Sequence, residues 1–256
     1  MAGSVTKVSL MVKKFGCVLF TFMILGVGAA NSSPATNGVP ESESRLISGW
    51  TVYVHKALLA TNAAMTARAL ALLEAQLEEI ARVVPPAALS ALRQVSLWLS
   101  PEYPEVQPRA EYHPNAQWLR EHDRNPAMAQ GVEFTNIRIF EAETRRMPNF
   151  ALHELAHAYH DRVLGNDNAD IKTVYQRAQA GGQYDRVEQR FGDGRSATVR
   201  AYAMSNPQEY FAESTEAFFS TNDFFPFTRE ELKRHDPEMF ELLKRLWGGA
   251  TDARPR

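Results

Sequence analysis

The chain has 256 residues, of which 45% are hydrophobic and 23% charged, a composition typical of a folded globular protein. Its formal net charge is −2, so it lacks the basic excess with which proteins release counterions from a phosphate backbone. Nucleic acid is therefore not expected as a partner. The length is enough for one compact domain with a single cleft, and it excludes a long array of domains.

Residues 1–30 have the pattern of a secretory signal peptide. Three lysines precede an apolar run over 15–27, the segment ends on the small residues 28–30, and it contains no Asp or Glu. We predict cleavage near residue 30, export to the periplasm or the extracellular medium, and no stable membrane association afterwards. An uncleaved signal anchor is the alternative, but the apolar run is shorter than the ~20 residues that a spanning helix needs.

The single cysteine, Cys17, lies inside this segment and would leave with it. The mature chain then has no disulfide and no thiolate, so His, Asp and Glu remain as candidate metal ligands. Residues 31–44 are rich in Ser, Pro, Asn and Gly and indicate a flexible leader. We expect an N-terminal lobe of helices and strands over 45–130 and a catalytic lobe over 131–256, packed together as one domain.

Hydrophobic periodicity and helix-ending residues predict an α+β fold that is rich in helices and has a small sheet. The N-terminal part is expected to contain a strand, one long helix, a second strand, an irregular proline-rich connection and a third strand: Trp50–His55, Lys56–Val84, Gln94–Leu99, Pro101–Pro126 and Val132–Phe140. The C-terminal part is expected to contain five helices: Asn149–Leu164, Ala169–Ala180, Pro207–Ser220, Arg229–Arg234 and Pro237–Trp247.

The first of these C-terminal helices carries the motif His153-Glu154-Leu155-Ala156-His157. Four residues along a helix correspond to about 40° of rotation and ~6 Å of rise, so both imidazoles project from one face and can bind one metal ion. Glu154 lies between them, where it can reach a water molecule at that ion. The pattern predicts a zinc site that activates water, provided that a third ligand is available.

Candidates for the third ligand occur on the same helix and on a second one. His160 lies one turn beyond His157, but three imidazoles along one straight helix do not surround a tetrahedral ion. We therefore interpret His160 as a buried, hydrogen-bonded residue that supports the ligands. In the second helix, Glu209 and Glu213 share one face, so that one can bind the metal while the other orients a histidine from behind. The spacing alone leaves both assignments open, because Glu209 also suits a capping box after Asn206.

The two motifs together resemble the gluzincin zinc metallopeptidases of the anthrax toxin lethal factor and Pro-Pro endopeptidase group. The resemblance covers about residues 150–219 and includes Glu209-Tyr210-Phe211-Ala212-Glu213, with Tyr202 seven residues before Glu209. It implies a zincin-like fold whose small mixed sheet has an edge strand beside the active-site helix. It also implies that His153, His157 and Glu209 bind one zinc ion, that Glu154 is the general base, and that Tyr202 stabilises the transition state.

The predicted function is that of a secreted zinc metallopeptidase that hydrolyses peptide bonds with metal-activated water and acts as a monomer on peptide or protein substrates. A substrate strand is expected to pair with an exposed edge of the 132–140 strand. Two alternatives share the constellation: an exported zinc-binding or peptide-binding protein without turnover, and a zinc hydrolase of a non-peptide amide or ester. The intact Glu154 argues against the first alternative.

Overall fold

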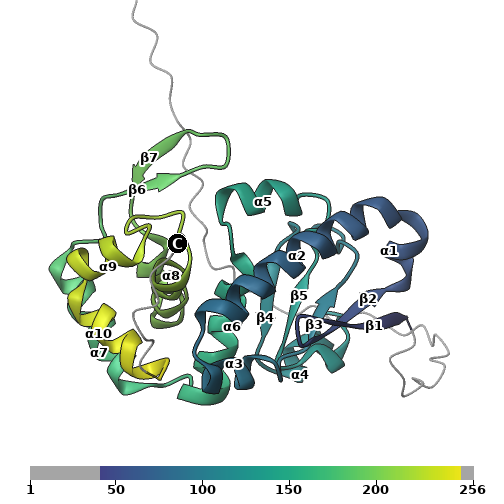
Figure 1. The fold of residues 1–256 in the computed structure, drawn as a ribbon, viewed down its shortest axis with the longest axis horizontal. Coiled ribbons are helices and arrows are strands. Elements are labelled where there is room, and N and C mark those ends of the chain that lie inside the picture. The colour runs from purple at the N-terminus through teal and green to yellow at the C-terminus, as the bar shows by residue number, and fades with distance from the viewer. Residues whose placement is uncertain (1–40, 249–256) are drawn as a thin grey trace, which may run out of the picture. The chain divides into compact units, whose positions relative to one another are not determined.

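The structure is a computed structural model that describes residues 41–248. A mixed sheet of five strands in the order β1-β2-β3-β5-β4 forms its framework (Figure 1). Strands β2, β3 and β5 run parallel to one another, and the two outer strands are antiparallel to their neighbours. The bounds are β1 Ser42–Ile47, β2 Trp50–His55, β3 Leu97–Leu99, β4 Ala110–His113 and β5 Gly131–Phe134, with a separate hairpin of β6 Val187–Arg190 and β7 Ser196–Val199.

The two faces of the sheet differ because side chains alternate along each strand. On one face, the aligned pairs Val52 and Leu97, then Leu99 and Phe134, are fully buried in the main core. On the other face, Tyr53 stacks on Trp98, with ring centroids 4.1 Å apart. The first face therefore belongs to the main core, while the second packs in a smaller cluster of Trp98, Leu119 and Met128.

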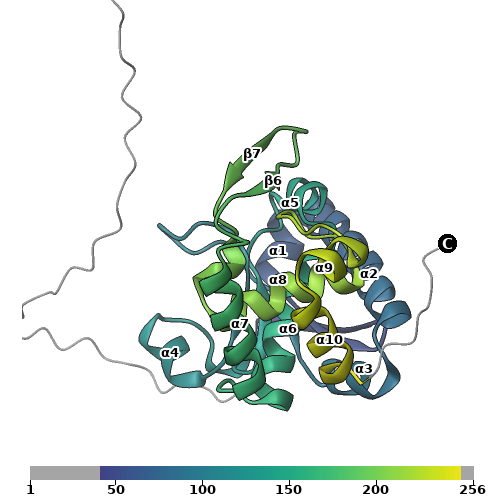
Figure 2. The same ribbon diagram turned by 90° about the vertical axis from the view of Figure 1, so that its left-hand side faces the viewer.

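Ten α-helices follow or separate the strands of the described chain: α1 Lys56–Thr61, α2 Ala63–Val83, α3 Pro86–Leu92, α4 Ala116–Glu121, α5 Phe140–Arg146, α6 Phe150–Tyr159, α7 Ala169–Gly181, α8 Pro207–Phe219, α9 Arg229–His235 and α10 Pro237–Leu246. Helices α2 and α3 contact α6, which lies against the sheet. Helix α8 contacts α6 as well as α7, α9 and α10, as Figures 1 and 2 show. The two helices that carry the sequence motifs thus pack directly against each other.

The predicted α+β architecture is confirmed, and each of the five C-terminal helices forms within a few residues of its expected bounds. The expected helix over 149–164 consists of α6 followed by a π-helical turn, His160–Leu164, and it ends at Gly165 with φ 81°. The single helix expected over 56–84 is wrong, because Asn62 leaves helical geometry at ψ 34° and separates α1 from α2. Thr61 donates its hydroxyl to the Ala57 carbonyl, which is the competition with backbone bonding expected of such residues.

The prediction of an edge strand over 132–140 is also wrong, both in the length of the strand and in its position in the sheet. Strand β5 ends at Phe134 and has a neighbour on each side, so it offers no free edge. Phe134, Phe140 and Phe150 instead form a buried aromatic cluster with centroids 4.7–6.1 Å apart, so the apolar alternation reflects burial of a turn and of α5. The edge beside the motif helix is β4, which lies inside the connection expected to be irregular over 101–126.

The N-terminal expectations are tested only in part. The leader expected over 31–44 overlaps β1, which begins at Ser42 and pairs with β2 along its whole length. Residues 31–40 of the expected leader and the expected signal peptide over 1–30 lie outside the described residues. Among residues 41–248, no helix is long and apolar enough to cross a membrane. The lobe boundary expected at 130/131 falls at the start of β5, so the sheet takes strands from both sides of it.

Candidate metal centre

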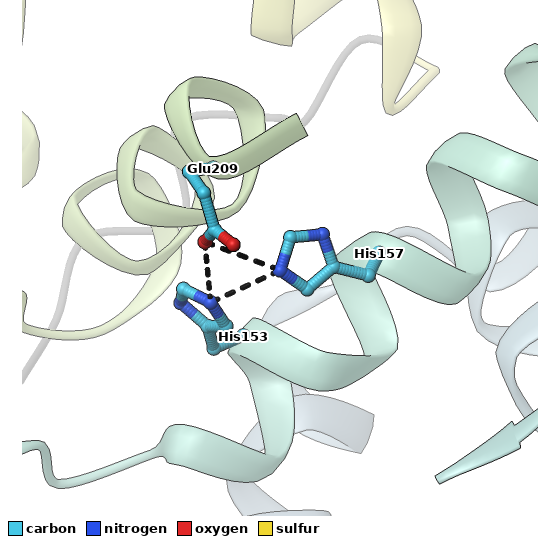
Figure 3. A group of neighbouring side chains, drawn as sticks. All are labelled: His153, His157 and Glu209. Atoms are coloured by element: carbon cyan, nitrogen blue, oxygen red, sulfur yellow. Dashed lines mark hydrogen bonds and ion pairs between the residues drawn. The ribbon is translucent and has the colours of Figure 1, made fainter. Parts of the chain in front are cut away.

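Three side chains from α6 and α8 converge on one point, as Figure 3 shows. The Nε2 atoms of His153 and His157 are 3.1 Å apart. Glu209 Oε2 lies 3.2 Å from the first nitrogen and 3.4 Å from the second. The spacing of the two histidines along α6 and the packing of α8 against this helix bring these three side chains together.

The three atoms fit a zinc ion. Ligand bonds of about 2.0–2.2 Å in tetrahedral geometry place neighbouring donor atoms about 3.3 Å apart, close to the three separations observed. Two imidazole nitrogens and one carboxylate oxygen are also ligands that zinc commonly takes in catalytic sites, where the fourth position stays open. His153, His157 and Glu209 are therefore the residues suited to hold the metal.

A carboxylate behind the cluster orients His153, but it is Glu216 and not Glu213. His153 Nδ1 donates to Glu216 Oε1 at 2.6 Å, whereas Glu213 Oε1 lies 3.9 Å from that nitrogen. Glu213 instead accepts a hydrogen bond from Asn222 at 3.0 Å. The bond to Glu216 leaves the lone pair on Nε2 free for a metal. Glu216 is seven residues from Glu209 and so shares its helix face, which is the signal that could have indicated it.

The ionised carboxylate of Glu209 supplies the cluster with the negative charge that a metal cation requires. Burial alone lowers the pKa of His153, but hydrogen bonds to Glu209 and Glu216 outweigh it and hold the pKa above its ordinary value. Burial alone would raise the pKa of Glu209, but the two histidines hold it well below its usual range. Burial, followed by the charge of Glu216, raises the pKa of Glu213. A buried carboxylate that faces two imidazoles therefore remains ionised.

Replacing Glu216 by Gln should lower zinc affinity about 10- to 100-fold, the usual cost of losing the acceptor behind a histidine ligand. The amide still fills the space, but it is a weaker acceptor for the Nδ1 proton of His153. Competition with a chromophoric chelator measures the affinity, and Glu213→Gln is the matched control because Glu213 makes no close bond to the ring. Equal affinities for the two variants would contradict the orienting role of Glu216.

His160 is buried, as expected, but it does not support the ligands by a hydrogen bond. Neither ring nitrogen has a hydrogen-bond partner within residues 41–248, and the ring lies against Phe211 with centroids 5.2 Å apart. Burial lowers the pKa of His160 to about 4, so the ring is neutral at pH 7. The structure brings it near the metal helices but not into the convergent group.

Glu154 and the edge strand meet beside this group. The backbone N–H of Tyr112 on β4 donates to Glu154 Oε2 at 2.9 Å. The Tyr112 hydroxyl donates to Asp161 Oδ2 at 2.7 Å, which ties β4 to the turn after α6 at a second point. Two hydrogen bonds therefore connect the edge strand to the motif helix and the turn after it, and one of them positions the Glu154 carboxylate beside β4.

Tyr202 stands at the opposite side of the group. Its hydroxyl is 3.3 Å from Glu209 Oε1, and the residue is 48% exposed. Burial of the hydroxyl region, and then the charge of Glu209, raises its pKa, so the hydroxyl keeps its proton at neutral pH. A cleft of about 450 Å³ runs from β4 across both histidines to Tyr202. The cleft is lined by five of the candidate residues, His153, Glu154, His157, Tyr202 and Glu209. The other two candidates, His160 and Glu213, do not line it.

Helix α2 contacts both helices that carry the convergent side chains. Asn149, which caps α6, donates to Glu79 Oε2 at 3.0 Å, and Ser220, which ends α8, donates to Glu79 Oε1 at 3.3 Å. Gln76 Oε1 accepts the N–H of Ala151 in the first turn of α6 at 2.9 Å. These long-range bonds fix the relative position of two helices whose ligands must meet within tenths of an ångström.

Comparison with known proteins identifies one family. The family described as "Anthrax toxin lethal factor, N- and C-terminal domain" matches residues 105–246, which is more than half of the chain. The match includes the edge strand β4, both metal-binding helices and the last helix. No curated protein and no solved structure matches the chain.

Proposed function

Because the chain belongs to the anthrax toxin lethal factor family of zinc metallopeptidases, we propose that His153, His157 and Glu209 bind its single catalytic zinc ion. We assign the role of general base to Glu154 and that of oxyanion donor to Tyr202. The convergence of two imidazole nitrogens and one carboxylate oxygen, 3.1–3.4 Å apart, carries this proposal. The Glu154 carboxylate beside this convergence favours turnover over simple zinc or peptide binding.

The side chains supply the proton transfers of peptide hydrolysis. Zinc, when bound, supplies the positive charge that makes a water acidic near neutral pH and polarises the scissile carbonyl. Glu154 Oε2 is held by the Tyr112 N–H, so Oε1 takes the proton from the attacking water and later delivers it to the leaving amine. The Tyr202 hydroxyl donates to the oxygen that becomes negative as the carbonyl carbon turns tetrahedral.

The substrate backbone aligns on β4. Arg109 and Thr135 face each other just beyond the ends of β4 and β5, where the Arg109 carbonyl accepts the Thr135 N–H at 3.0 Å. Backbone groups alternate along a strand, so those of Ala110 and Tyr112 are directed to the outer side of the sheet. The N–H of Tyr112 is taken by Glu154, and the Ala110 groups and the Tyr112 carbonyl remain for pairing with an extended peptide.

Digestion of a mixed peptide library by the purified full-length chain tests the proposed activity. We expect cleavage that stops when a zinc chelator is added, that returns when zinc is restored, and that accompanies one zinc per chain in elemental analysis. The products, read by mass spectrometry, would also map the cleaved bonds. Cleavage that is insensitive to the chelator, or an absence of cleavage in every peptide with zinc bound, would contradict the proposal.

Tyr202→Phe should lower kcat about 10²-fold and leave KM nearly unchanged, because an oxyanion donor acts only in the transition state. The phenyl ring keeps the packing of the tyrosine, so zinc content and thermal stability should match those of the native chain. Steady-state kinetics on one cleaved peptide measures the effect. A rise in KM with unchanged kcat would place Tyr202 in ground-state substrate binding instead.

We propose that the enzyme is exported. The basic start, the apolar run over 15–27 and the small residues at 28–30 support this. N-terminal sequencing of the protein recovered from cell fractions and from the medium is the test. A sequence that starts near residue 31 is the expected result, and a chain that retains Met1 inside the cell would overturn the proposal.

A further inference from the structure

A second recess opens beside the catalytic group and has a different lining. It has a volume of about 320 Å³ and shares Arg109, Ala110, His153, Glu154 and Tyr202 with the main cleft. The rest of its wall comes from the turn after β5, the end of α5, the first turn of α6, the β6–β7 hairpin, α8 and the loop after α8. The recess therefore lies where a side chain next to the scissile bond would enter, toward the N-terminal end of α6.

The wall of the recess combines an apolar part with a charged end. Met147 and Phe224 supply the apolar part. At the charged end, Arg146 donates from Nη1 to Asp223 Oδ2 and from Nη2 to Glu143 Oε2, both at 2.7 Å. Two carboxylates thus face one guanidinium, which leaves a net negative charge. An anionic substrate group would be repelled here, because these two carboxylates compensate Arg146, and the other cation of the wall, Arg109, is paired with Glu111 at 2.9 Å.

Two buried oxygen atoms in the wall lack donors. Asn136 and Asp223 line the recess, and each residue is 1% exposed. Neither Asn136 Oδ1 nor Asp223 Oδ1 has a hydrogen-bond partner among residues 41–248. Buried acceptors are almost always satisfied in native proteins, so a donor from outside the chain is the missing element. The unpartnered oxygens and the excess of carboxylates both favour a ligand that is positively charged and donates hydrogen bonds.

The hairpin fixes the position of Asp223. The N–H of Arg190 donates to the Asp223 carbonyl at 2.8 Å, and Gln189 donates to its carboxylate at 3.4 Å. At the hairpin turn, Gly192 lies so close to α5 that a Cβ there would be 3.2 Å from the Ala142 carbonyl oxygen. The hairpin thus contacts both α5 and Asp223. These contacts preorganise the Asp223 carboxylate for a ligand.

We propose that this recess binds a basic side chain, lysine or arginine, at a position flanking the scissile bond; this specificity rests on the proposed peptidase function. The methylene stem packs on Met147 and Phe224, and the cationic head donates to Glu143 and Asp223. A basic side chain satisfies both features of the recess, because its stem is apolar and its head carries several donors and no acceptor.

Matched peptides test the inference. After the cleaved bonds are mapped, peptides are compared that carry lysine, norleucine or glutamate at each flanking position. At one position, kcat/KM should be at least about 50-fold higher for lysine than for norleucine, and glutamate should be the poorest. The preference should shrink at high salt, as expected for ion pairing that is partly exposed.

Two variants connect the preference to the recess. Glu143→Gln should reduce the lysine preference, the ratio of kcat/KM for the lysine and norleucine peptides, about 10-fold, and continued cleavage of the norleucine peptide would show that the variant is folded and active. Glu188→Gln is the matched control, because Glu188 lies on the hairpin and its carboxylate pairs only with Arg190 within the described part of the chain. It should leave both rates unchanged.

The outcomes separate the two proposals. If no peptide is cleaved, the proposed function fails. If peptides are cleaved but norleucine equals lysine at both flanking positions, the specificity inference is wrong and the peptidase function stands. A lysine preference that survives Glu143→Gln unchanged would also overturn the assignment of this recess.

Discussion

A Glu209→Gln variant should bind zinc more than about 100-fold more weakly than the native chain, because it replaces a charged ligand by a neutral amide. The loss should exceed the effect of Glu216→Gln, which changes only the acceptor behind His153. Helix α8 should still form, since the Asn206 side chain caps it by accepting the backbone N–H at position 209. Elemental analysis and chelator competition give the affinity, and circular dichroism checks the fold.

Glu213→Gln is the control that distinguishes the two carboxylates left open by the sequence. Glu213 lies with Glu216 on the Nδ1 side of His153, away from the convergent Nε2 atoms. These three residues form a second group with metal-capable atoms, although Nδ1 is already occupied by its bond to Glu216. Zinc lost in Glu213→Gln and retained in Glu209→Gln would move the metal to that group and refute the assignment.

Glu154→Gln should lower kcat about 10³-fold or more and leave zinc content at the native level. A glutamine can still accept the N–H of Tyr112, so the edge strand should keep its place, but an amide cannot take a proton from water. General acid–base catalysis typically contributes about 10²–10⁴-fold, and Glu154 serves in both proton transfers. Single-turnover kinetics on a cleaved peptide measures the chemical step separately from binding.

The zinc content of the same Glu154→Gln sample distinguishes a lost base from a lost metal. Glu121→Gln provides a matched surface substitution, since Glu121 is exposed and bonds only to Gln117 among the described residues. It should keep the native kcat. If Glu154→Gln retained a tenth or more of the native kcat with full zinc, another group would have to carry the proton, and our assignment of Glu154 would be wrong.

The catalytic helix could be predicted from the sequence because its signals are local. The periodicity of the apolar residues, Pro148 before the first turn and Gly165 at the end define it, and the spacing of His153 and His157 then places both rings on one face. The same reasoning places Glu209 and Glu213 on one face of α8. These results need no information about distant parts of the chain.

The edge strand could not be predicted, because its pattern is weak and its partner is remote. Ala110–His113 lies among prolines, and it becomes a strand only by pairing with β5, about twenty residues further along the chain. The 132–140 segment has a strong strand pattern, but only its first residues form a strand. Phe140 is apolar because it packs in the core against Phe134 and Phe150 from the start of α5. Alternation of apolar and polar residues in a sequence indicates which side chains are buried. It does not specify whether a strand, a turn or a helix buries them.

The sequence by itself determined the five C-terminal helices, the pair of histidines with Glu154 between them, and a short list of acidic partners, because helical geometry follows from local spacing. The tertiary structure alone decided that Glu216, and not Glu213, holds His153, and that β4 borders the cleft. Those choices depend on how α6 and α8 pack against each other and how α2 holds their ends. Packing involves residues far apart in the chain, and sequence periodicity carries no information about their relative position.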